Sequence, residues 1–240
     1  MKLRLLGSML IICLLSVPDA ISQDIHGEND VWFLLLTHYK INEQLSLGNE
    51  LHFRYNDYLN DKQQFLLRPF IDYKANDVVT YSFGYTYIRT NPYGEFPLPE
   101  IKPEHNIWEQ INLKHTVGQT TVQHRYRAEQ RWQGDLVLDP GTTEYQVDGY
   151  ELSHRFRYRL TLTRPINDRW FVNVFDEIWV KTDNKLVAAD YDRNWIYVGL
   201  GHKFSDLLSI QVAYLHQHAK NNPTRFERHP TLQLTADIQL

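Results

Sequence analysis

Six arginines stand at alternate positions of two neighbouring segments, and one glutamate continues the pattern. In order along the chain, these residues are Arg125, Arg127, Glu129, Arg131, Arg155, Arg157 and Arg159. Residues two apart in a β-strand lie on the same face, so paired strands would bring the guanidinium groups close together. Guanidinium groups bind carboxylates and phosphates through two parallel hydrogen bonds. The pattern therefore indicates a place where anions are bound or paired.

Such a cluster needs partners if it is enclosed, because a buried charge without a counter-charge is costly. The candidate carboxylates on matching strand faces are Glu50, Asp72, Glu129, Glu177 and Asp237. Our first interpretation is a salt-bridged network that fills and rigidifies an enclosed space. The second is the wall of a narrow pore for small anionic solutes, because rings of arginine favour anions and phosphates. The same arginines could instead bind an anionic lipid headgroup or substrate.

Serines and histidines are weaker candidates for chemistry. His216 and His218 share a strand face and could ligate a metal, but the sequence shows no third ligand near them, so we predict solvated strand-end histidines. The candidate pieces of a lipid hydrolase are Ser153 with His154, Ser82 and Ser209. Ser153 and His154 are adjacent, so their side chains face opposite sides of a strand. We predict no catalytic residue, no cofactor and no metal site.

The arginine segments belong to a series of candidate strands, and no stretch shows helical periodicity. The eleven candidates are residues 31–41, 44–57, 64–75, 78–90, 105–117, 120–133, 151–164, 169–181, 193–204, 207–220 and 229–240. A tilted strand needs about 9–11 residues to cross a membrane, whereas the mean strand of a globular protein has about 5–6. The candidates have the length that a membrane requires.

The connections between these strands alternate between short and long. The short ones are residues 42–43, 76–77, 118–119, 165–168 and 205–206, and the long ones are 58–63, 91–104, 134–150, 182–192 and 221–228. Transmembrane barrels have short turns on the periplasmic side and long loops outside. Together with 15 Tyr and 6 Trp for aromatic girdles, this predicts an all-β fold: an antiparallel up-and-down transmembrane β-barrel of about 10–12 strands.

The number of strands raises a question of parity. Bacterial single-chain barrels have an even number of strands, so we expect ten or twelve rather than eleven. Eleven would leave the start of the first strand at the outer end, unless residues 23–29 thread the lumen or one candidate splits or fails.

Several other residues are notable for the face on which they fall. Glu109 and Asp176 fall on the lipid-facing side, where carboxylates are disfavoured. We expect them to lie near an interface or to be turned inward by a β-bulge at residues 176–177. Inward-facing glycines are Gly48, Gly84, Gly199 and Gly201. We expect them to relieve crowding against the long inward arginines or to allow the sheet to curve.

The start of the sequence predicts export. Lys2 and Arg4 precede an apolar run, and a small-x-small motif ends at Ser22, which is typical of a cleavable signal peptide. We therefore divide the chain into a signal peptide, residues 1–22, and a barrel domain, residues 23–240. Removing the signal removes the single cysteine and changes the net charge from −4 to −5. The mature chain can form neither disulfides nor thiolate metal sites, and it has no basic excess with which to bind nucleic acid.

A series of motifs resembles a known family. They are Trp32 on the first strand, residues 42–47, the arginine-rich residues 125–131 and 155–160, the pair at 176–177, residues 193–201, and the pair at 214–215. In this order they resemble the outer-membrane β-barrel family known as domain of unknown function 2490. The resemblance covers nearly the whole mature chain. It implies a barrel in the outer membrane of a Gram-negative bacterium, and it carries over no catalytic residues.

We therefore expect a non-enzymatic outer-membrane barrel. It would act as a structural barrel or as a narrow pore whose lumen is lined by arginine, glutamate and aspartate. Its expected partners are outer-membrane lipids, the barrel-assembly machinery and small anionic solutes. The alternatives are a membrane-embedded lipid-modifying hydrolase and an adhesin or receptor that works through its outer loops.

Overall fold

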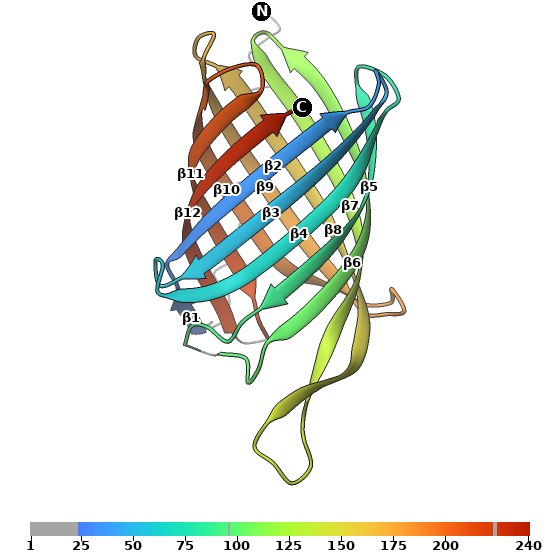
Figure 1. The fold of residues 1–240 in the computed structure, drawn as a ribbon, viewed down its shortest axis with the longest axis vertical. Helices are drawn as coiled ribbons and strands as arrows, with labels where there is room; N and C mark the ends of the chain where they lie inside the picture. Colours follow the sequence, from blue (N-terminus) through green and yellow to red (C-terminus); the bar gives the residue numbers. More distant parts are fainter. Residues whose placement is uncertain (1–23, 96, 223–224) are drawn as a thin grey trace, which may run out of the picture.

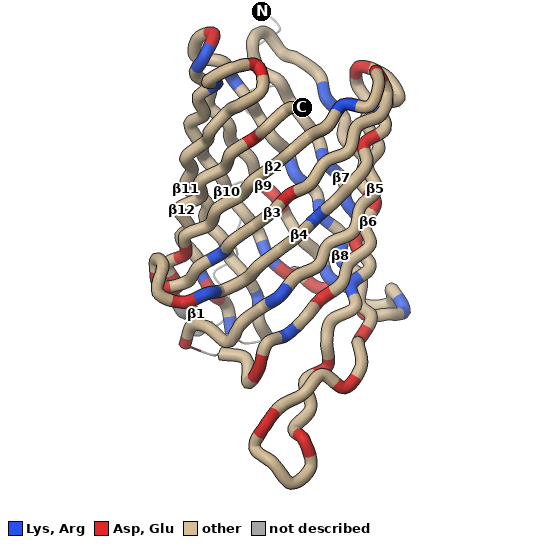
Figure 2. Tube along the Cα trace, in the orientation of Figure 1, with Lys and Arg blue, Asp and Glu red and all other residues tan. Residues whose placement is uncertain are grey.

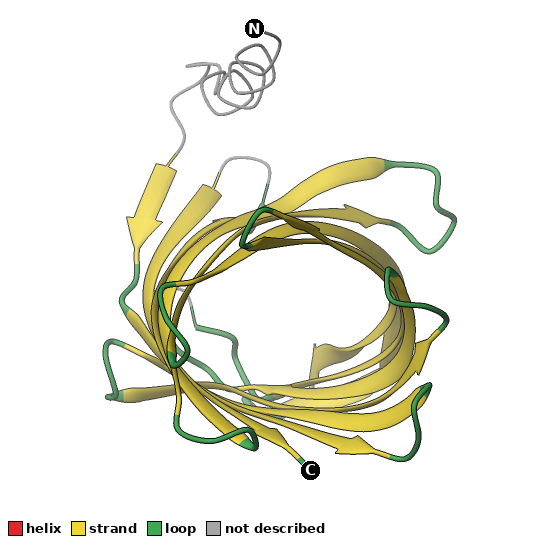
Figure 3. Cartoon of the chain, turned by 90° about the horizontal axis from the view of Figure 1, so that it is seen from above, coloured by secondary structure: helices red, strands yellow, loops and turns green. Residues whose placement is uncertain are grey.

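The computed structural model describes residues 24–95, 97–222 and 225–240. The strands in these ranges are β1 (Asp24–Gly27), β2 (Asp30–Lys40), β3 (Leu45–Asn56), β4 (Asp61–Lys74), β5 (Val79–Thr90), β6 (Lys102–Val117), β7 (Thr120–Leu138), β8 (Tyr145–Pro165), β9 (Trp170–Thr182), β10 (Ala189–Lys203), β11 (Leu208–Lys220) and β12 (Arg225–Gln239). β2 to β12 form a closed barrel of tilted strands (Figures 1 and 3). The eleven candidate strands correspond to β2–β12, so the predicted barrel is confirmed.

The barrel closes through a parallel pair. From β2 to β12 each strand is antiparallel to the next, and β12 then pairs with β2 in parallel, from Thr231 with Asp30 to Gln239 with His38. The expectation of ten or twelve strands was therefore wrong, because none of the eleven candidates splits or fails. With an odd number, the first and last strands run in the same direction. Their parallel ladder joins the two sheet edges that would otherwise be open.

The start of the described chain extends this seam. β1 pairs in parallel with the beginning of β12, from Asp24 with Arg225 to Gly27 with Arg228, in the same register offset as β2. The expectation that residues 23–29 thread the lumen was therefore wrong for residues 24–29. Gln23 and the predicted signal peptide, residues 1–22, lie outside the described residues. β2 therefore begins at the end of the barrel that carries the long loops, and β12 finishes at the end with the short turns (Figure 1).

Four of the five short turns use one local device. A side-chain oxygen at the start of the turn accepts hydrogen bonds from the backbone N–H groups two and three residues later, at 2.8–3.2 Å. The accepting residues are Asn42, Asn76, Asn167 and Ser205. Asn and Ser favour turns because their short side chains can make this bond. In the fifth turn Gly118 adopts a φ of 62°, which glycine tolerates without steric cost.

The two faces of the wall follow the alternation of the sequence. In β5, Tyr81 and Phe83 are 48% and 53% exposed, whereas Ser82 between them is 6% exposed. The outer face is accordingly apolar and aromatic, and the inner face is polar, with large aromatic groups among the polar ones. No helix in the described ranges is long and apolar enough to cross a membrane.

The long-loop end differs from the expectation in one place. The predicted loop 134–150 is a continuation of β7 and β8, which remain paired as far as Leu138 and Tyr145, with a register shift at Gly134 and Leu136. The resulting two-stranded ribbon projects well beyond the rest of the barrel (Figure 1). The sequence interpretation failed here because Gly134 and the turn residues 139–141 resemble the start and middle of a loop.

Candidate functional site

Arg157 lies at the centre of the charged groups inside the barrel. Its Nε donates to Glu177 Oε1 at 2.7 Å, and its Nη1 donates to Glu129 Oε1 at 2.8 Å. Arg157 is 5% exposed, Glu129 3% and Glu177 0%. One guanidinium group on β8 therefore joins carboxylates from the two neighbouring strands, β7 and β9.

The strand register brings further arginines onto the same two carboxylates. Glu129 is directly opposite Arg155, and Glu177 is directly opposite Arg159. Arg155 Nη2 lies 2.5 Å from Glu129 Oε2, and Arg159 Nη2 lies 2.5 Å from Glu177 Oε2. Arg125, from β7, reaches Glu177 Oε1 at 2.5 Å. Opposite charges paired across strands in this way are favourable in a β-sheet.

Two other carboxylates hold arginines on the wall formed by β3–β7. Glu104 receives Nε and Nη2 of Arg131 at 2.8 and 2.9 Å, which is a bidentate pair. Glu50 is paired with Arg68 and accepts a second contact from His52. Figure 2 shows Lys and Arg in blue and Asp and Glu in red along the strands of the wall.

Nine of the ten residues proposed from the sequence as a lumen charge network make ion pairs with one another or with a neighbour. Arg127 has the loosest pair, with its Nη1 3.9 Å from Glu129 Oε1, and its Nε donates to Gln110 Oε1 at 2.8 Å. Asp72 is the exception. It is partly buried, makes no ion pair among the described residues, and lines a cavity at the short-turn end of the lumen together with Lys114 and Gln239. Asp237 likewise bonds only the Gln239 amide, at 2.6 Å.

Sequence reasoning missed a second set of inward side chains, which are aromatic. Trp32, Trp179 and Trp195 are 2–5% exposed and pack together, with ring centroids of Trp32 and Trp195 5.5 Å apart and those of Trp179 and Trp195 4.5 Å apart. They come from β2, β9 and β10, so the stack bridges strands that are not neighbours in the wall. Their inward position follows from the same alternation that placed the arginines, and that alternation was the available signal.

Arginines stack on these rings. The guanidinium carbon of Arg54 lies 3.7 Å from the centroid of Trp32, and that of Arg157 lies 3.7 Å from the centroid of Trp179. A guanidinium group over an indole face is attracted by the ring quadrupole, and the attraction strengthens when both groups are desolvated. Arg54 on β3 also lies 5.8 Å from the centroid of Trp195 on β10. The network therefore extends across the lumen as well as along its wall.

A hydrogen-bonded hub closes the network toward the long-loop end. Asp30, 2% exposed, accepts amide N–H groups from Asn56 at 3.0 Å, Gln63 at 3.0 Å and Gln217 at 3.4 Å. His229 Nδ1 lies 3.3 Å from the same carboxylate. The hub thus joins β2, β3, β4, β11 and β12. Beyond it, in the loop between β5 and β6, burial and the carboxylates of Asp30 and Glu227 raise the pKa of Tyr93, which keeps its hydroxyl protonated.

The charged network and the tryptophans line a cavity of about 290 Å³ on the inner side of the wall. Its lining is drawn from ten strands. The charged members are Arg54, Arg68, Arg125, Arg131, Arg155, Arg157, Arg159 and Arg193, with Glu50 and Glu104. Trp32, Trp179 and Trp195 contribute the aromatic part.

The inward glycines accommodate rings rather than arginines. A Cβ atom at Gly48 would lie 2.1 Å from the Phe70 ring, and one at Gly84 would lie 2.2 Å from the Trp108 ring. The expectation that these glycines make room for arginines was wrong, because the rings on the neighbouring strands lie across them. At Gly199 and Gly201 the nearest atoms likewise belong to Tyr197 and Phe171.

The serines proposed for a hydrolase lie apart from histidine partners. Ser153 faces inward and donates to Gln133 Oε1 at 3.4 Å, while His154 projects from the opposite face. Ser82 is buried in the lumen, and Ser209 lines a second cavity at the short-turn end. His216 and His218 contact Tyr214 and Tyr191. No group of three or more His, Cys, Asp and Glu that could hold a metal ion occurs in residues 24–95, 97–222 and 225–240.

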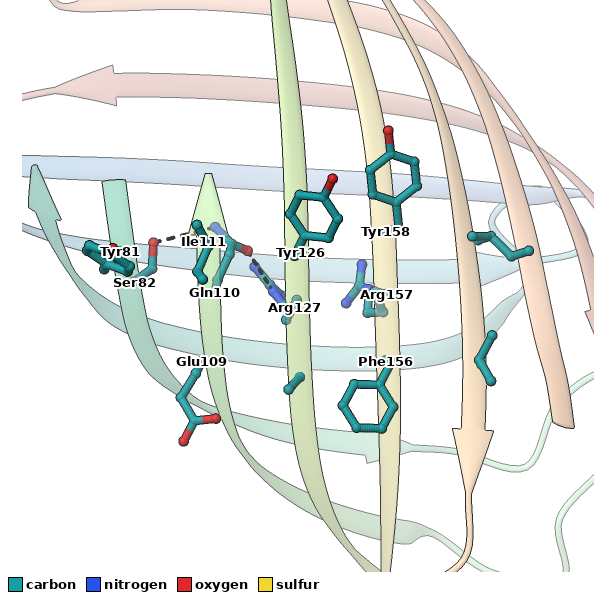
Figure 4. Close-up of a pocket in the computed structure, with 13 residues that line it drawn as sticks. Tyr81, Ser82, Glu109, Gln110, Ile111, Tyr126, Arg127, Phe156, Arg157 and Tyr158 are labelled. Carbon is teal, nitrogen blue, oxygen red and sulfur yellow. Dashed lines mark hydrogen bonds between the residues drawn. The ribbon is translucent and has the colours of Figure 1, made fainter. Parts of the chain in front are cut away.

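Glu109 and Asp176 project outward from unbroken strand pairings, so the bulge expected at residues 176–177 was wrong. Asn194 Nδ2 donates to Asp176 Oδ1 at 2.6 Å. Glu109 borders an outer-wall groove of about 600 Å³ lined mainly by aromatic and aliphatic side chains. Gln110, the residue after Glu109, turns to the other face of the strand. Its amide N–H donates to Ser82, and its Oε1 accepts from Arg127 (Figure 4).

These features match one family. The family described as Protein of unknown function (DUF2490) matches residues 29–228. The chain belongs to this family. The match runs from the start of β2 into β12, so it covers almost the whole closed barrel, and it confirms the resemblance found in the sequence.

A relative and several solved structures are also similar. An uncharacterized protein of Methylorubrum extorquens is 23% identical over 249 residues, which cover 95% of each chain. The NanC porin is 10% identical, with a TM-score of 0.46 over 80% of this chain and 81% of that one. The translocator domain of autotransporter NalP from Neisseria meningitidis is 13% identical, with a TM-score of 0.45 over 78% and 71% of the two chains. The β domain of the Bordetella autotransporter BrkA is 7% identical, with a TM-score of 0.46 over 79% and 82%.

Proposed function

We propose that this protein is a non-enzymatic barrel of the Gram-negative outer membrane whose lumen is closed by its arginine, carboxylate and tryptophan network. Its apolar outer face suits a lipid environment, and its strands have the length needed to cross one. Outer-membrane lipids and the barrel-assembly machinery would be its partners. In this role the protein is a structural barrel rather than an open channel.

The observation that carries the proposal is the stack that crosses the lumen. Trp32, Trp195 and Trp179 lie in contact, and Arg54 and Arg157 cover their faces. All five side chains are less than 9% exposed. Barrels of about eight strands are filled by their own side chains, whereas those of about 16–18 hold an aqueous channel. Eleven strands fall between these sizes, and the tryptophan and arginine side chains that fill this lumen support the closed type.

The test is conductance of the refolded mature protein in a planar bilayer. We expect no steady conductance from protein whose fold has been verified by circular dichroism. The matched variant Trp32→Ala, Arg54→Ala, Trp195→Ala removes the bridge and is expected to conduct if it folds by the same criterion. Steady, anion-preferring current through the unaltered protein would contradict a closed lumen. A shift of its selectivity toward cations in Arg157→Glu would then identify an arginine-lined pore.

One observation favours a second candidate function, a receptor or adhesin. The β7–β8 ribbon projects from the long-loop end and exposes Leu138, Tyr145, Val147 and Tyr150, each 38–48% exposed. Exposed apolar groups beyond a membrane suit contact with another molecule. Deleting residues 135–148 should abolish such binding and leave the barrel assembled, because the ribbon lies outside the closed ladder. Binding to cells or matrix that survives the deletion would argue against this candidate.

A further inference from the structure

We propose that the cavity inside the barrel is a binding site for a small oxyanion, a carboxylate or an inorganic phosphate, held by Arg54, Arg125, Trp179 and Trp195. The site would be a built-in part of the folded lumen, between the Asp30 hub and the middle of the barrel. The inference goes beyond a closed lumen and does not depend on whether the barrel conducts.

The first observation is a set of buried donors with no acceptor. Arg54 Nε, Arg125 Nε, Trp179 Nε1 and Trp195 Nε1 are shielded from solvent and have no hydrogen-bond partner in the described part of the chain. All four residues line the cavity. Trp179 and Trp195 are 5% exposed and Arg54 is 8% exposed. Arginine and tryptophan side chains can only donate hydrogen bonds, so these groups require an acceptor that the lining does not supply.

The second observation is the balance of charge. The cavity lining holds eight arginines and two carboxylates, Glu50 and Glu104. Three further carboxylates, Glu129, Glu177 and Asp192, bind some of these arginines from beside the cavity. Asp30, in the hub, also attracts Arg54. Against these six carboxylates, the eight arginines are in excess by two. Because arginine stays protonated and an unpaired buried charge is costly, the surplus favours a bound anion.

Arg54 is the arginine with the least compensation. Arg131, Arg155, Arg157 and Arg159 each have a carboxylate within 2.9 Å. Arg54 instead donates Nη1 to the neutral Gln64 Oε1 at 2.8 Å and stacks on Trp32. Arg54 makes no ion pair with a described carboxylate, and its compensation is the longer-range attraction of the buried Asp30. Its Nε therefore remains available to an anion.

Size and chemistry together define the ligand class. A cavity of about 290 Å³ has room for roughly ten molecules of water at about 30 Å³ each, which is enough for a phosphate or a short carboxylate with some water. N–H donors of guanidinium and indole groups on the lining match the oxygens of such an anion. The enclosure by wall, stack and hub excludes the headgroup of a lipid that remains in the membrane.

The experiment is refolding in neutral detergent without lipid, in buffers that contain inorganic phosphate, acetate or sodium chloride at one ionic strength. Refolding exposes the site, so enclosure does not prevent loading. We expect phosphate or acetate, at about ten times its Kd, to raise Tm by roughly 3–6 °C over chloride. We also expect it to change the tryptophan fluorescence saturably, since Trp179 and Trp195 line the site.

Matched variants make the result specific. Arg54→Met keeps an unbranched side chain of similar length and should abolish both the anion-dependent Tm shift and the fluorescence change. Trp195→Phe, which retains a ring but loses the N–H donor, should weaken the binding. Arg164→Met, at an exposed arginine near the short turn between β8 and β9, should behave like the unaltered protein.

Two results would overturn the proposal. One is an equal Tm in all three salts with no saturable fluorescence change. The other is an anion effect that Arg54→Met leaves intact. Conductance measured on the same samples separates this outcome from failure of the closed-lumen proposal, because a conducting barrel can still show the saturable, Arg54-dependent effect.

Discussion

Glu177 is the most completely buried acid of the described lumen, and three arginines converge on it. Arg125, Arg157 and Arg159 each lie within 2.7 Å of one of its oxygens. A buried pair contributes less net stability than its Coulomb attraction suggests, because both ions lose hydration. Removing one partner is nevertheless costly, because the remaining charge stays buried. The number of partners therefore determines how much each residue matters.

Loss of Arg157 should be among the most destabilising single changes. Arg157→Ala removes two hydrogen bonds to buried carboxylates, one to Glu177 and one to Glu129. Both acids keep other arginines, so we take the loss from these two bonds and expect about 3–5 kcal/mol in the free energy of unfolding. Denaturant unfolding in detergent is the measurement. Arg164→Ala, at an exposed arginine of the same strand, should change stability by less than about 0.5 kcal/mol. Equal stability of Arg157→Ala and the unaltered protein would show that the pairing is not structural.

The two acids of the network should differ in the same assay. Glu177→Gln strips a charge from three arginines, whereas Glu50→Gln affects Arg68 and the contact with His52. We expect Glu177→Gln to lower the unfolding midpoint more than Glu50→Gln. The reverse order would mean that the crowded side of β7–β9 is not the main source of electrostatic stability.

At the scale of elements, each strand turns one face outward and one to the lumen, and the strand boundaries were predictable from that alternation. Turn residues such as Asn42 and Asn76 mark the ends locally. The alternation also placed the arginines inward. It could not identify Trp32 or Arg54 as members of the network, because their partners come from strands that are distant in sequence. Nor could the alternation show whether the number of strands is odd or even, because that depends on which strand pairs with β2 when the barrel closes.

The inward glycines make a prediction about packing between strands. Gly84→Val places methyl groups against the Trp108 ring, because a Cβ atom at residue 84 would lie 2.2 Å from that ring. We expect a loss of about 1–3 kcal/mol in stability from overpacking. Adding Trp108→Leu should recover part of this loss, because the two sites are in direct contact. Simple additivity of the two losses would contradict that contact.

The parallel seam can be tested chemically, because the mature chain is expected to have no cysteine. Phe33 and Leu234 are registered partners on the outer face, so Phe33→Cys with Leu234→Cys should oxidise to a disulfide. Strand neighbours lie about 4.8 Å apart, within the range for a disulfide. The control pair Leu35→Cys with Leu232→Cys is displaced along the seam by four residues and should remain reduced. Crosslinking of the control pair alone would mean a different closure.

At the scale of the whole molecule, the barrel is a narrow closed ladder with a polar, aromatic core. Ordinary globular domains bury apolar groups and expose charge, whereas here several of the most buried side chains are charged, such as Arg127, Glu129 and Glu177, and many large apolar groups lie exposed on the outer face. The consequence is that stability depends on how well the interior charges are matched. Buried positive charge that the carboxylates of the chain do not pair has to be balanced by a bound ion or ligand.

The odd number of strands also decides where the chain begins and ends. β1 and the start of β2 lie at the long-loop end, and β12 finishes at the short-turn end. In the outer membrane proposed above, with the long loops outside, a short epitope fused ahead of residue 24 would be displayed to antibodies on intact cells, while one fused after Leu240 would be hidden until the envelope is opened. The two tails of this one polypeptide would act as labels for opposite sides of the same membrane.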